Sequence, residues 1–120
     1  MGKTFKLKND IHIANDLYST SERVIGTWVD GKTLYRKCVA ITLPDNGEAS
    51  FSTGLSNVNV ISLTGTVKSG TTSIPIIYNN VVYAGTSIHC FYSNGTLFVG
   101  CSFSGTNYTG YVILEYTKNL

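Results

Sequence analysis

Residues 21–37 read Ser-Glu-Arg-Val-Ile-Gly-Thr-Trp-Val-Asp-Gly-Lys-Thr-Leu-Tyr-Arg-Lys. Two runs of β-forming residues flank Asp30-Gly31, and this dipeptide supplies the positive φ values that a two-residue hairpin turn requires. A turn centred on it pairs Gly26 with Tyr35 and places Trp28 diagonal to that ring on the same face. The stretch therefore predicts a β-hairpin whose register is held by Tyr35 lying over the bare backbone of Gly26.

Strand and turn signals continue along the chain after this hairpin. The expected strands are residues 23–29, 32–43, 48–53, 58–67, 73–78, 81–84, 87–93, 96–103 and 110–117. Short strands separated by turns rich in Gly, Asn and Pro are typical of a β-sandwich. We expect an all-β, antiparallel β-sandwich with a jelly-roll-like arrangement over residues 18–120, preceded by a polar neck or linker at residues 1–17.

A second hairpin is predicted around Asn94-Gly95, where a two-residue turn pairs Phe91 with Phe98 and His89 with Gly100. One face of this hairpin then suits the core, with Ile88, Cys90, Tyr92, Leu97, Val99, Cys101 and Phe103. The other face opposes the two phenylalanines directly. Because a strand pair that is apolar on both faces has no side suited to water, we expect the second face to meet another subunit or another layer.

Charge is distributed unevenly along the chain. Thirteen of the 16 Lys, Arg, Asp and Glu residues fall at or before Glu48, and the 46 residues from 69 to 114 contain none. A soluble surface normally carries charges, so we expect this surface to be covered, most simply by further copies of the chain; a neutral glycan is also compatible. The net charge of only +2 does not favour a nucleic-acid partner. The sequence lacks an apolar run of roughly 18 residues, so we expect no membrane insertion.

Catalytic and metal-binding patterns are weak. A glycosidase needs two carboxylates that face each other across a sugar, and no such pair is evident. Cys90 follows His89 directly, so in a strand their side chains point to opposite faces and cannot form a nucleophile–base pair. His12 and His89 lie 77 positions apart, with no carboxylate cluster near either. We expect no enzymatic activity, no metal site and no cofactor.

The three cysteines, Cys38, Cys90 and Cys101, form no metal-binding or redox pair in the sequence. In the predicted second hairpin Cys90 and Cys101 are diagonal neighbours, and diagonal pairs lie beyond comfortable disulfide reach. We expect three free thiols. A contact of Cys38 or Cys101 with a histidine through tertiary structure stays open.

Three stretches resemble the C-terminal domains of bacteriophage tail fibres and receptor-binding proteins. Residues 23–37 are similar to a segment that in relatives often has the sequence Ile-Gly-Thr-Trp-Ile-Asp-Gly-Lys-Pro-hydrophobic-Tyr-Arg-Lys. Thr33 stands here in place of the proline. Residues 54–65, GLSNVNVISLTG, and 110–118, GYVILEYTK, follow in the expected order. The resemblance spans about residues 18–118, and residues 68–103 carry no recognisable piece of it.

The resemblance implies a homotrimeric head domain at the tail-fibre tip of a virion, made in the cytoplasm of the host bacterium. Its implied partner is a bacterial surface saccharide or a teichoic-acid-like polymer, bound for host recognition. Two alternatives stay open: a structural trimerisation or capping module of a fibre, and a stand-alone bacterial lectin.

Candidate contact residues follow from residue type and position. Turns expose aromatic and amide groups, and tyrosine rings and asparagine amides suit sugar faces and hydroxyls. The candidate glycan-binding residues are Tyr78, Asn79, Asn80, Tyr92, Asn94, Asn107 and Tyr108, with ordinary turn chemistry as the alternative. The candidate subunit-interface residues are Trp28, Tyr35, His89, Phe91 and Phe98.

Overall fold

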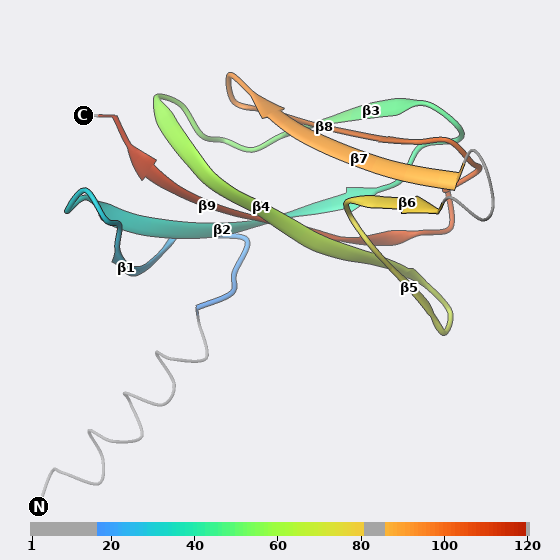
Figure 1. The fold of residues 1–120 in the computed structure, drawn as a ribbon, viewed down its shortest axis with the longest axis horizontal. Helices are drawn as coiled ribbons and strands as arrows, with labels where there is room; N and C mark the ends of the chain where they lie inside the picture. Colours follow the sequence, from blue (N-terminus) through green and yellow to red (C-terminus); the bar gives the residue numbers. More distant parts are fainter. Residues whose placement is uncertain (1–16, 81–85, 120) are drawn as a thin grey trace, which may run out of the picture.

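The computed structural model describes residues 17–80 and 86–119, and every regular element in these ranges is a β-strand. The first sheet has the order β1 (Arg23–Thr27), β2 (Thr33–Thr42), β9 (Thr109–Lys118), β4 (Val58–Ser69) and β5 (Thr72–Pro75). The second has the order β3 (Glu48–Ser52), β8 (Thr96–Cys101), β7 (Thr86–Ser93) and β6 (Tyr78–Asn80). Neighbouring strands are antiparallel, and the sheets form two layers (Figure 1). The predicted antiparallel β-sandwich is confirmed.

The core lies between the two layers. It is built from alternate residues of the long strands: Leu114 and Tyr116 of β9 and Leu97 and Val99 of β8 are all 0% exposed. Their neighbours along β9 are more exposed up to Glu115, as expected for a strand with one inward face. Burying each such leucine or valine stabilises the fold by roughly 1.5–3 kcal/mol, so these residues fix the sheets against each other.

The Asn94-Gly95 hairpin forms as predicted. Asn94 and Gly95 both have positive φ, 49° and 87°, which is the backbone of a two-residue turn matching the strand twist. The register pairs Phe91 with Phe98 and His89 with Gly100. One face therefore enters the core and the other faces away from it.

The first hairpin forms, but its predicted register is wrong. Trp28 N–H donates to Lys32 O at 2.8 Å, so three residues rather than two make the turn. Asp30 does not take the positive φ that a two-residue turn needs; its carboxylate instead accepts a hydrogen bond from Lys32 N–H at 3.0 Å. Gly31 alone supplies the positive φ, 89°, as in a turn that ends in a glycine bulge.

This longer turn changes the partner of Tyr35. Tyr35 pairs with Val24, and Gly26 pairs with Leu34, with a register shift between Val24 and Gly26. The ring of Tyr35 stacks on Tyr116 of β9, with 5.7 Å between centroids, instead of covering Gly26. Tyr35 therefore packs against the core.

The chain changes sheets inside the strand predicted at residues 73–78. Pro75, which has no N–H to donate to a ladder, ends β5 in the first sheet, and Tyr78 begins β6 in the second. Between them Ile76 is 2% exposed and its N–H donates to Gly65 O at 3.0 Å. The strand predicted at residues 81–84 lies outside the described residues, as do residues 1–16 of the predicted neck.

Candidate functional site

Two stacked phenylalanines stand on the outer face of the second sheet. Phe91 of β7 and Phe98 of β8 are cross-strand partners whose ring centroids lie 4.9 Å apart, with 17° between the ring planes. Phe91 is 46% exposed. The two rings of such a pair stabilise each other by stacking, yet Phe91 keeps almost half of its surface in contact with water.

A carboxylate and an imidazole lie on one side of these rings. Glu48 of β3 and His89 of β7 both pair with Gly100, the residue between them on β8. His89 Nε2 lies 3.5 Å from Glu48 Oε2, and a Cβ atom at Gly100 would overlap the His89 ring. The missing side chain at Gly100 therefore lets the imidazole lie across β8 toward the carboxylate.

Hydroxyl groups lie on the other side of the rings. Thr96 pairs with Ser93 on β7 and with Ser52 on β3, and both serines are exposed. Ser50, also exposed, is the partner of Phe98. Residues two apart on a strand are about 7 Å from each other, so each row of polar groups lies about that far from the aromatic pair along the strands.

We call this surface the platform face; it consists of Glu48, Ser50, Ser52, His89, Phe91, Ser93, Thr96 and Phe98. Sequence analysis identified Phe91, Phe98 and His89 as interface candidates and did not identify Glu48, Ser50 or Ser52. The predicted hairpin register already placed His89 opposite Gly100. The sequence did not predict that β3, which carries the Glu48 carboxylate, lies beside β8.

The predicted glycan-binding tyrosines are placed differently from our expectation. Tyr78, Tyr92 and Tyr108 are half-buried and pack against the core. Tyr78 and Tyr92 pair with the inward residues Ile88 and Leu97, which explains their inward orientation. These three rings therefore do not form exposed turn surfaces.

The predicted asparagines are not brought together. Asn94 is exposed in the turn between β7 and β8. Asn79 and Asn80 lie on β6, whose partners are at the opposite end of β7, and Asn107 is exposed in the connection to β9. The side chains of Asn79 and Asn80 lie outside the described part of the structure. The structure thus separates Asn94 from the other candidates by the length of β7.

The predicted interface residues divide between the two sheets. Trp28 is half-buried beside the turn of the first hairpin, and Tyr35 stacks on Tyr116. His89, Phe91 and Phe98 all lie on the platform face of the second sheet. The structure therefore brings three of the five candidates together and makes Tyr35 part of the packing between elements.

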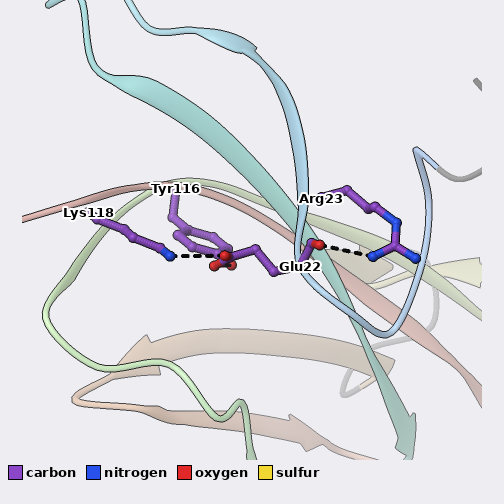
Figure 2. A network of polar contacts seen from close by, with 4 residues as sticks. All are labelled: Glu22, Arg23, Tyr116 and Lys118. Carbon is purple, nitrogen blue, oxygen red and sulfur yellow. Dashed lines mark hydrogen bonds and ion pairs between the residues drawn. The ribbon is translucent and has the colours of Figure 1, made fainter. Parts of the chain in front are cut away.

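A separate polar network fastens the segment before β1 to the first sheet (Figure 2). Glu22 accepts hydrogen bonds from the Tyr116 hydroxyl at 2.5 Å and from Lys118 Nζ at 2.9 Å. Burial acts to raise the pKa of Glu22, but the hydrogen bonds from Tyr116 and Lys118 outweigh it and lower that pKa. Burial and the Glu22 carboxylate together raise the pKa of Tyr116 far above its ordinary value. Sequence analysis did not foresee this network, because its members are 94 or more positions apart.

The outer face of the first sheet carries a mainly uncharged trough, in which Lys68 is the charged lining residue. Tyr111 of β9 is 51% exposed and lies between two hollows of about 420 and 520 Å³. The smaller hollow is lined by Tyr18, Ser19, Thr20, Cys38, Tyr111 and Ile113. We call the two hollows and Tyr111 the Tyr111 trough.

The reactive groups of the described residues do not converge. Cys90 faces the core and burial raises the pKa of its thiol to about 11, whereas His89 lies on the platform face. All three cysteines are free thiols. Residues 17–80 and 86–119 contain no group of three His, Cys, Asp or Glu side chains placed to hold a metal ion. No helix long and apolar enough to cross a membrane occurs in these ranges.

No protein-family model, curated protein or solved structure matches this chain. The resemblance to tail-fibre domains remains a prediction from the sequence.

Proposed function

We propose that this domain binds a glycan of the bacterial cell surface through the platform face, as the tip domain of a homotrimeric phage tail fibre. The observation that carries the proposal is the outward-facing Phe91–Phe98 stack, with Phe91 exposed and Phe98 half-buried, between two rows of polar side chains. A pyranose ring has an apolar C–H face and a rim of hydroxyls. An aromatic surface flanked by hydrogen-bonding groups complements both features.

The polar groups supply different hydrogen-bonding capacities. The Glu48 carboxylate accepts from sugar hydroxyls, and the hydroxyls of Ser50, Ser52 and Ser93 both donate and accept. His89 adds a ring nitrogen beside Glu48. These groups orient a saccharide without breaking a bond, so the proposed activity is recognition rather than catalysis.

The Tyr111 trough is the surface that we propose for contact between copies of the chain. It is uncharged along most of its lining, and its two hollows have room for side chains of a neighbouring copy. Assigning the trough to subunit contact leaves the platform face free for ligand. Three platform faces on one tip would then bind a repetitive surface polymer with avidity well above the affinity of a single site.

The double variant Phe91→Ala/Phe98→Ala tests the site. We expect its binding to responsive bacterial strains or their purified cell-wall polysaccharides to fall at least about 30-fold, the loss typical of a binding hot spot. Its mass by light scattering stays near three times 13.0 kDa. Tyr111→Lys is the matched variant on the other sheet: it lowers the mass and keeps single-site binding.

The outcomes separate the alternatives. Unchanged adhesion of the Phe91→Ala/Phe98→Ala variant would refute the platform face as the site. Dissociation of that variant into monomers would show that Phe91 and Phe98 belong to the subunit interface, as predicted from the sequence. A trimer that binds no glycan would favour a structural trimerisation or capping module, which the Tyr111 trough alone would serve. A monomer that binds glycan would favour a stand-alone lectin.

A further inference from the structure

We infer that the platform face selects an uncharged glycan chain and discriminates against a phosphate-bearing polymer such as teichoic acid. This inference rests on the proposed function, because it specifies the ligand class of the same site. Glu48 is the residue to which we assign the discrimination.

The charges of the second sheet support this selectivity. Glu48 is the single formally charged residue in strands β3, β6, β7 and β8, and these strands contain no lysine or arginine. The side chain of Glu48 is 47% exposed at the edge of the aromatic pair. An incoming phosphodiester would therefore meet a carboxylate beside the aromatic pair and no lysine or arginine from these four strands.

Phosphate recognition normally uses groups that the platform face does not present. Proteins hold phosphates with arginine forks, lysines or backbone N–H groups at helix N-termini. The platform residues lie in the paired strands β3, β7 and β8, whose backbone groups on either side of β8 form ladder hydrogen bonds. What remains is hydroxyl, carboxylate, imidazole and aromatic surface, which suits hydroxyl-bearing ligands.

Among the described residues, the lysines and arginines belong to the first sheet, its hairpin turn or its strand β2, from which Lys37 Nζ donates to Thr53 O at 2.6 Å just after β3. Lys32 and Lys118 line a hollow of about 280 Å³ beside Tyr35 at one end of the first sheet. Lys118 is already paired with Glu22 at 2.9 Å and lies 4.4 Å from the centre of the Tyr35 ring. A polyanion would be drawn toward that end of the molecule and away from the aromatic pair.

The Glu48–His89 pair gives the platform face a specific way to read hydroxyl groups. Its carboxylate accepts hydrogen bonds, and the imidazole offers two ring nitrogens for hydrogen bonding. Adjacent hydroxyls of a hexose present donors and acceptors at comparable spacing. Because Gly100 lets the two side chains approach, both reach the same sugar.

Binding of the full chain to two immobilised polymers tests the inference: a neutral polysaccharide of hexose and N-acetylhexosamine, and poly(glycerol phosphate) teichoic acid. We expect at least about tenfold tighter binding to the neutral polymer at low salt, the difference that corresponds to 1.4 kcal/mol. Glu48→Lys should raise teichoic-acid binding about tenfold. Glu48→Gln removes one negative charge from the platform face, which makes the net charge more positive by one unit. Ser73→Lys changes the net charge by the same amount on β5 of the first sheet and is the matched control.

Three results decide the matter. A larger gain in teichoic-acid binding for Glu48→Gln than for Ser73→Lys supports the assignment to Glu48. Wild-type binding to teichoic acid at least as tight as to the neutral polymer overturns the inference, and the proposed function survives if Phe91→Ala/Phe98→Ala abolishes that binding. Failure to bind either polymer, or any of a panel of cell-wall glycans, overturns both.

Discussion

The two sheets of this domain have opposite surface chemistry. The strands of the first sheet carry six charged residues, Arg23, Arg36, Lys37, Lys68, Glu115 and Lys118, and those of the second carry only Glu48. Several of the first-sheet charges are tied into contacts between elements, such as Arg36–Glu115 at 2.7 Å between β2 and β9 and Lys118–Glu22 at 2.9 Å between β9 and the segment before β1. The difference indicates a structural role for the polar groups of the first sheet and a surface role for those of the second.

Aromatic residues show the same contrast. Tyr116 of the first sheet is 0% exposed, with its hydroxyl bonded to Glu22, whereas Phe91 of the second sheet is 46% exposed. Exposed apolar patches on soluble proteins commonly mark contact surfaces. On the first sheet Tyr116 is thus buried in the core while Tyr111 of the same strand is 51% exposed, and on the second sheet two aromatic side chains stack on each other on the outer face.

The largest expected effect tests whether the two sheets fold as one unit. Leu114 of β9 and Leu97 of β8 are chemically identical, fully buried and drawn from different sheets. We expect Leu114→Ala and Leu97→Ala each to lower the free energy of unfolding by roughly 2–5 kcal/mol, because each leaves a cavity in the shared core. Urea denaturation followed by tryptophan fluorescence and by circular dichroism should give one coincident transition for both. Separate transitions would mean that the sheets unfold independently.

The next largest expected effect is a difference in stability loss between variants of Glu22, which contacts the first sheet, and Glu48 of the second sheet. Glu22→Ala leaves the Tyr116 hydroxyl buried without its acceptor and should cost about 1–3 kcal/mol of stability. Glu48→Ala removes an exposed carboxylate and should cost less than about 0.5 kcal/mol. Tyr116→Phe removes the group that needs the acceptor, so Glu22→Ala should cost less in that background. Equal losses for the two single variants would contradict the assigned roles.

Local signals predicted the second hairpin more accurately than the first. Asn94 and Gly95 both tolerate positive φ, so the turn length and the whole register of β7 and β8 followed from two residues. In the first hairpin Asp30 uses its carboxylate to accept the Lys32 N–H. That side-chain contact favours a longer turn, which pairs Gly26 with Leu34, and the register shift between Val24 and Gly26 then pairs Tyr35 with Val24.

Tertiary structure decided what the sequence pattern could not. The predicted hairpin placed Phe91 and Phe98 together, but the carboxylate of the platform face comes from Glu48 on β3, whose position beside β8 depends on sheet order. The same reasoning explains the tyrosines: nearness to a turn suggested exposure, while the alternation of the strand directs Tyr92 inward opposite Leu97. Five of the eight platform residues lie on the predicted hairpin, and the other three come from β3, whose place in the sheet the hairpin does not determine.

Acid should weaken the first sheet through Glu22. The pKa of Glu22 is lowered from 4.5 in the folded chain, since the hydrogen bonds from Tyr116 and Lys118 outweigh the opposing effect of burial. The unfolded chain therefore binds the proton more readily, and protonation favours unfolding. The contribution is fully present above about pH 4.5 and is lost as the pH falls through the lower folded pKa. Melting temperatures between neutral and acidic pH should show the wild type converging on Glu22→Gln; a constant difference would contradict this.

The smallest effect compares one ion pair from each sheet. Arg36 donates to Glu115 Oε2 from Nε at 3.0 Å and from a terminal nitrogen at 2.7 Å, with the two side chains 15% and 26% exposed. The His89 and Glu48 side chains are 59% and 47% exposed, at 3.5 Å. We expect Glu115→Gln to lower stability by up to about 1 kcal/mol and Glu48→Gln to leave it nearly unchanged, because exposed pairs contribute little. Melting temperatures measured at low salt and at about 1 M salt test this expectation. At about 1 M salt charges are screened over a few ångströms, so the stability difference between the wild type and Glu115→Gln should be smaller than at low salt. A larger loss for Glu48→Gln would make Glu48 a structural residue and remove it from the ligand site.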